Sequence, residues 1–290
     1  MGPLLRRTLG VFTLGMMMLA VPGAQAAPDL KAETEQGRRI AETVQATVAA
    51  VNALLAHPHA PPHANTFFVL RRAGDWYVYF GWLEKDGSRY TPALVMTAPA
   101  GKLEQMHQMN GAGSSAKLTA YARAVSFAQA QAAKATGDRH LDPVLFPTAS
   151  GIDVYVIQGG PMHDAIRLGG DFLFHFDAQA KHLRAQVRFH KAVIRVPLAD
   201  PRLPSGKTVG SYHTHVIDEE PTATDVAAAI LHPALAPMVV IGRSGAAYRV
   251  DATGAMKLEP AFAATADVPL AAQDGGVVLA PAEALPANAR

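Results

Sequence analysis

The chain has 290 residues, of which 49% are hydrophobic and 17% are charged, so it is long enough to bury one or two sizeable cores. It contains no cysteine, which excludes disulfides and thiolate metal ligands and leaves His, Asp and Glu as metal-binding side chains. The formal net charge is +2 and no cluster of Lys and Arg exceeds a pair, so we expect no nucleic-acid partner.

Residues 1–26 have the features of a secretory signal peptide. Arg6 and Arg7 precede an apolar run from Leu9 to Val21, and Ala24-Gln25-Ala26 supplies small residues for cleavage. No later segment is long and apolar enough to span a bilayer. We therefore expect a periplasmic or secreted protein with no membrane span after the signal peptide is removed.

Residues 27–141 are predicted to form an N-terminal α+β region. Apolar residues at spacings of three and four predict helices over Asp29–Ala56 and Ala116–Thr136. Alternating segments between the helices predict a β-meander of three strands: Thr66–Leu70, Trp76–Leu83 and Pro92–Thr97.

Short strands dominate residues 142–262, which we predict to be a second domain. The predicted elements are strands over Ile152–Ile157, Asp171–Phe176, one long strand over Ala185–Val196 with room for a bulge, Thr208–His215, a helix over Thr222–Leu231, and strands over Met238–Ile241 and Ala247–Val250. Residues 263–290 are dominated by Ala and Pro, which predicts a disordered tail.

Three side chains near the end of this region form a candidate metal site. His213 and His215 alternate in a predicted strand, so both imidazoles face the same side. Asp225 follows in the first turn of the predicted helix. Two imidazoles and a carboxylate are a zinc-binding set that leaves a fourth position for water. Alternatively, Thr222 and Asp225 are only a helix N-cap, because Thr-x-x-Asp is also a capping pattern.

The surrounding segment resembles the JAMM (JAB1/MPN/Mov34) metallopeptidase motif, over roughly residues 150–260. His213-Thr214-His215 is followed by a short loop, by Pro221-Thr222-Ala223-Thr224-Asp225 and by an Ala-rich helix, in the family's order. Val216 stands where the family usually has proline, the loop is one residue shorter, and Thr222 replaces serine. The resemblance implies an α/β sandwich with a JAMM/MPN-like mixed sheet and a central helix.

The resemblance also implies a chemistry for these residues. His213, His215 and Asp225 would hold Zn²⁺, which lowers the pKa of a bound water to about 7. Thr222 would help orient groups around the attacked carbonyl of a peptide or protein substrate. The implied activity is that of a zinc metallopeptidase that hydrolyses a peptide or isopeptide bond.

The general-base glutamate of the family is not found. Its position is occupied by Ile166 or Arg167, and neither side chain can accept a proton. Four other acids are candidates for this role: Asp164, Asp171, Glu219 and Glu220. Three histidines match no ligand spacing, and we interpret them as surface or sheet-face residues: His175, His182 and His190.

Three interpretations therefore stay open. The chain is an exported JAMM-like metallopeptidase, or a catalytically inactive JAMM-like binding module, or an unrelated α+β protein in which the two histidines and the cap coincide by chance.

Overall fold

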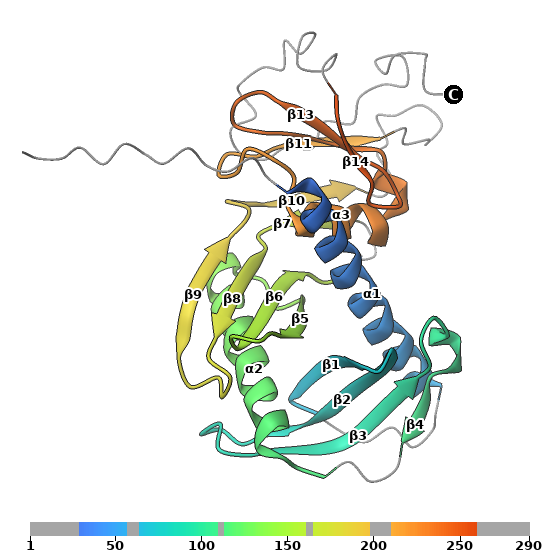
Figure 1. Ribbon diagram of the computed structural model, residues 1–290, viewed down its shortest axis with the longest axis vertical. Helices are drawn as coiled ribbons and strands as arrows, with labels where there is room; N and C mark the ends of the chain where they lie inside the picture. Colours follow the sequence, from blue (N-terminus) through green and yellow to red (C-terminus); the bar gives the residue numbers. More distant parts are fainter. Residues whose placement is uncertain (1–28, 57–63, 110–112, 161–164, 198–209, 260–290) are drawn as a thin grey trace, which may run out of the picture.

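The computed structural model describes residues 29–56, 64–109, 113–160, 165–197 and 210–259. Over these ranges the protein is a mixed α+β structure with three α-helices and several mainly antiparallel sheets (Figure 1). None of the described helices combines the length and the apolar character needed to cross a membrane. The predicted signal peptide and the predicted C-terminal tail lie outside the described residues.

The two long helices confirm the sequence prediction. Helix α1 (Leu30–Leu55) begins after Asp29, whose carboxylate accepts two backbone N–H groups of the first turn. Helix α2 (Ala116–Thr136) begins after Ser115, and it ends at Gly137, which has the left-handed φ of 74° that favours glycine. The apolar period and the capping residues agree at both helices, so their bounds could be read locally.

The predicted meander is also confirmed. The first sheet has the order β1-β2-β3-β4, all antiparallel, with the short 3₁₀ helix η1 (Leu103–Gln105) before its last strand. Its strands are β1 (Thr66–Arg72), β2 (Asp75–Leu83), β3 (Tyr90–Ala98) and β4 (His107–Met109). One face of this sheet packs on α1 and the other on α2, so both faces are buried.

A second antiparallel sheet has the order β5-β6-β8-β9. Its strands are β5 (Leu141–Pro147), β6 (Ile152–Gln158), β8 (Phe172–Phe176) and β9 (Leu183–Arg188). The three phenylalanines of β8 share a core with α2, whereas Leu173 faces a core shared with α1. Both cores contain residues from the two sides of the domain boundary predicted at residue 142.

The single strand predicted over Ala185–Val196 is wrong. The structure has two strands there: β9 ends at Arg188, and β10 (Val193–Pro197) pairs with β7 (Ala165–Gly169) in a separate sheet. Arg188 stabilises the turn between them, because its guanidinium donates to the carbonyls of His190, at 2.9 Å, and Lys191. The residues before and after the break both alternate in the way typical of a strand, so the periodicity of the sequence alone does not reveal the break.

The last sheet has the order β11-β12-β13-β14. Its strands are β11 (Ser211–Thr214), β12 (Met238–Ile241), β13 (Ala247–Val250) and β14 (Met256–Leu258). Helix α3 (Ala223–Leu231) and the 3₁₀ helix η2 (Pro233–Leu235) connect β11 to β12, which pair in parallel. Helix α3 packs closely on α1, where a Cβ at Gly37 would lie 2.4 Å from the Cβ of Val226.

Candidate metal centre

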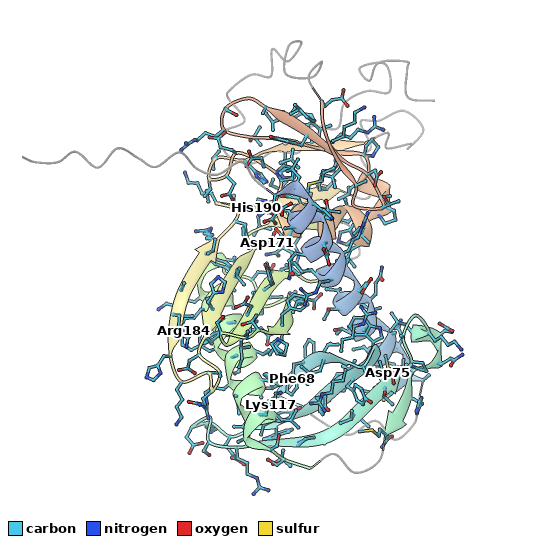
Figure 2. All side chains as sticks on the ribbon, viewed as in Figure 1. Phe68, Asp75, Lys117, Asp171, Arg184 and His190 are labelled. Atoms are coloured by element: carbon cyan, nitrogen blue, oxygen red, sulfur yellow. The ribbon has the colours of Figure 1, made fainter. Side chains whose placement is uncertain are left out.

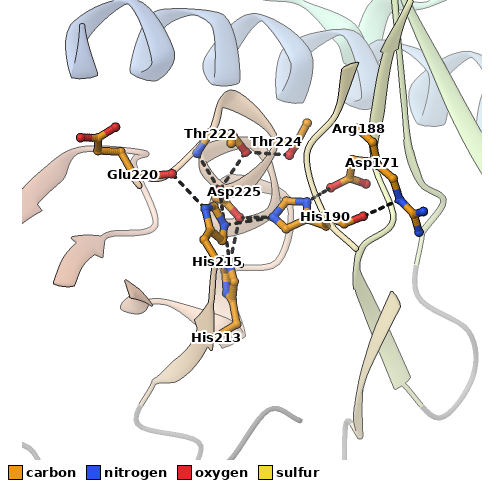
Figure 3. Close-up of polar contacts among 9 residues, drawn as sticks. All are labelled: Asp171, Arg188, His190, His213, His215, Glu220, Thr222, Thr224 and Asp225. Carbon is orange, nitrogen blue, oxygen red and sulfur yellow. Dashed lines mark hydrogen bonds and ion pairs between the residues drawn. The ribbon is translucent and has the colours of Figure 1, made fainter. Parts of the chain in front are cut away.

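Strand β11 places His213 and His215 on one side of the last sheet, as the alternation predicts. The parallel pairing continues beyond the strand, because the N–H of His215 donates to the carbonyl of Ile241 at 2.7 Å. Both histidines are buried, with 4% and 3% of their surface exposed. Their Nε2 atoms lie 3.2 Å apart, so the two rings converge on one point (Figure 3).

Asp225 reaches the same point from the first turn of α3, and it also caps the helix. Its Oδ2 accepts hydrogen bonds from the N–H and the hydroxyl of Thr222, at 2.7 and 2.8 Å. Its Oδ1 lies 3.0 Å from His213 Nε2. The capping interpretation and the metal interpretation are therefore compatible, because each uses a different oxygen of one carboxylate.

A third histidine, His190, completes the cluster from the connection between β9 and β10. Its Nε2 lies 3.1 Å from His215 Nε2 and 3.2 Å from Asp225 Oδ1. The interpretation of His190 as a surface or sheet-face residue is wrong, because it is only 8% exposed and faces the other ligand candidates. His175 and His182 lie outside the cluster and bond instead to Asp153 and Asp177.

The four side chains fit a tetrahedral cation. One nitrogen or oxygen from each of His190, His213, His215 and Asp225 lies within 4.8 Å of all the others. Four of the six separations among the three Nε2 atoms and Asp225 Oδ1 are 3.0 to 3.2 Å. A tetrahedral zinc ion with ligands at about 2.0–2.1 Å places its donors about 3.3 Å apart. A divalent cation could therefore occupy the centre with little movement of the side chains.

Groups around the cluster orient two of the imidazoles. His215 Nδ1 lies 2.9 Å from the carbonyl of Glu220 and donates to it, so the neutral ring would present its Nε2 lone pair to a cation at the centre. His190 Nδ1 lies 3.1 Å from Asp171 Oδ2, a carboxylate–histidine arrangement that is common behind metal ligands (Figure 3). Asp171, a candidate base, instead lies behind His190.

The charges of the cluster are strongly coupled. Burial opposes the ionisation of Asp225, but the nearby His215 and His190 hold its pKa well below the usual range. Burial also disfavours a charged His190, but Asp225 and Asp171 outweigh it and raise the pKa of His190 to about 10. Burial lowers the pKa of His213. The metal-free cluster thus retains a proton on His190 that a bound cation must displace.

This proton predicts how pH acts on the protein. The raised pKa of His190 stabilises the metal-free protein fully below about pH 6.5, the unfolded value, and this contribution is lost as pH rises towards 10. Metal competes with the same proton, so metal binding tightens over that range. We expect the difference in Tm between metal-loaded and chelator-treated protein to grow between pH 6.5 and about pH 9. A difference that shrinks with rising pH would contradict this assignment.

Ile166 and Arg167, the two residues at which the resemblance would require a glutamate, take part in other contacts. Ile166 is buried in an apolar cluster with side chains of α3 and β12. The buried guanidinium of Arg167 forms an ion pair with Asp138 and donates to the carbonyl of His140. These contacts give both side chains a structural role.

Two of the remaining candidate bases, Glu219 and Glu220, do not point into the cluster. Glu219 bonds to the Arg243 side chain at 3.1 Å and to the Ser244 N–H at 2.7 Å, at the turn before β13. Glu220 contributes its backbone carbonyl, and its carboxylate points away from His215 (Figure 3). Asp164 lies outside the described residues.

Comparison of the chain with protein-family models, with curated proteins and with solved structures found no match.

Proposed function

We propose that this chain is an exported, JAMM-like binding module in which His190, His213, His215 and Asp225 hold one structural Zn²⁺. The observation that carries this proposal is the third imidazole, which lies 3.1 Å from His215 Nε2. Structural zinc sites have four protein ligands, whereas catalytic sites have three and keep one position for water. His190 would take the place that water has in a metallopeptidase of this type.

The donor set favours zinc over other common cations. Three imidazole nitrogens and one carboxylate suit zinc, whereas calcium and magnesium prefer oxygen ligands in larger numbers. The cluster is buried, so water contributes little to it. The spacing of the donors matches a small tetrahedral ion.

The JAMM-like assignment has support from the order of the elements around the centre. Strand β11 carries the two histidines, α3 carries Asp225 in its first turn, and the adjacent strands β12 and β13 follow. Positions 166 and 167 carry Ile and Arg, neither of which can act as the general base. This favours the inactive module over the metallopeptidase. Thr222 would then act as a helix cap rather than in catalysis.

Metal analysis and activity assays on the purified protein test this proposal. We expect about one zinc per chain, a lower Tm after chelation, and no hydrolysis of peptide or isopeptide libraries. His213→Ala should contain no zinc, and like the native protein it should hydrolyse none of the peptides. Hydrolysis by the native protein that disappears in His213→Ala would instead establish the metallopeptidase.

A further inference from the structure

Strand β9 has an open outer edge. It is the last strand in the order β5-β6-β8-β9, and no other strand in the described ranges pairs with its far side (Figure 1). All residues from Leu183 to Arg188 are exposed. The N–H of Phe189 donates to Asp171, on the inner side, so alternation directs the peptide groups of Gln186 and Arg188 outward.

The charges along this edge are positive. Arg184, labelled in Figure 2, donates to the carbonyl of Ser150 at 2.7 Å, and Arg188 donates to the carbonyls of the turn after the strand. β9 contains neither proline nor acidic residues, and its two charged residues are Arg184 and Arg188. The unpaired backbone groups of β9 therefore lie next to positively charged side chains.

Two cavities with shared lining residues lie at the start of β9. The first has a volume of about 350 Å³ and is lined by Phe127, Phe176, Leu183, Arg123 and Lys181. Phe127 and Leu183 are 41% and 39% exposed, which is high for such apolar side chains.

The second cavity, of about 560 Å³, shares Arg123 and Lys181 with the first. It adds Arg89 and several hydroxyl groups, and no acidic side chain lines either cavity. The more apolar cavity and the more cationic cavity thus share Lys181, two residues before β9.

We propose that this surface binds an extended acidic peptide segment, which adds to β9 as a further strand. Backbone hydrogen bonds to an open edge provide affinity, and side-chain pockets provide specificity. An aromatic side chain of the peptide would rest against Phe127 and Leu183, and a carboxylate two residues away, on the same face of the strand, would face Lys181 and Arg123. A free anion or a lipid would use the cations but not the open edge. The surface does not depend on the metal assignment.

The test measures binding of a fluorescein-labelled octapeptide, Thr-Val-Asp-Thr-Phe-Thr-Asp-Val, in which the two acids and the aromatic residue share one face of the strand. Gln186→Pro removes an outward N–H at an edge position that tolerates proline, and should weaken binding at least about tenfold. Lys181→Glu should weaken it about three- to tenfold, whereas Lys134→Glu, the same charge change at the far end of α2, should have no effect. Metal content should stay unchanged in all three variants.

A second experiment changes the peptide and leaves the protein native. The same peptide with alternate backbone nitrogens methylated cannot donate to β9, and it should bind at least about tenfold more weakly. The proposal is overturned if the native protein shows no binding up to about 1 mM peptide. It is also overturned if methylation and Gln186→Pro leave binding intact, since loss in Lys181→Glu alone would indicate a simple anion site.

Discussion

Replacing Asp225 with asparagine should abolish stoichiometric metal binding and lower the free energy of unfolding by about 3–5 kcal/mol. Asp225 is 3% exposed, and its carboxylate is surrounded by three imidazoles, of which His190 is positively charged in the metal-free protein. Asparagine has the same shape, and its amide oxygen can still accept the N–H of Thr222. The loss of stability and of metal in Asp225→Asn therefore results from removing the buried charge and not from removing the helix cap. Metal analysis and denaturant unfolding measure the two effects.

Thr222→Ala is the matched control for the cap. It removes the hydroxyl that donates to Asp225 Oδ2 but leaves all four candidate ligands in place. We expect a loss of about 1 kcal/mol in the free energy of unfolding and an unchanged metal content. If Asp225→Asn costs no more than Thr222→Ala and keeps the metal, Asp225 is only a capping residue.

His190→Ala should weaken zinc binding more than about 100-fold, beyond the usual effect of losing an orienting group. The substitution removes one of four donors and leaves His213, His215 and Asp225 as an open three-ligand set. Chelator competition followed by metal analysis measures the change in affinity. Unchanged affinity in His190→Ala would show that three ligands suffice and would favour a site with a free position for water.

Two further variants test whether the loss of zinc affinity in His190→Ala is due to coordination. Asp171→Asn weakens the contact to His190 Nδ1 without removing a ligand, so a smaller loss of about 10- to 100-fold is expected. His175→Ala also removes a histidine bonded to a carboxylate, Asp153, but outside the cluster. It should leave zinc affinity unchanged. Equal losses in His175→Ala and His190→Ala would point to general destabilisation rather than coordination.

Much of the fold is readable from local patterns. Helices α1 and α2 and the meander β1–β3 agree with the sequence because the apolar period, the caps and the turns each act within a few residues. The break between β9 and β10 is the clearest failure. Two strands that belong to different sheets follow each other in the chain, and only their different pairing partners separate them.

The amino-acid sequence by itself determined three members of the candidate centre. His213 and His215 share a face because strand side chains alternate, and Asp225 lies at a helix start because Thr222 caps it. The tertiary structure alone decided the fourth, His190. It reaches the cluster because the chain leaves one sheet after Arg188 and crosses to another, and no local spacing encodes which distant residues that crossing brings together.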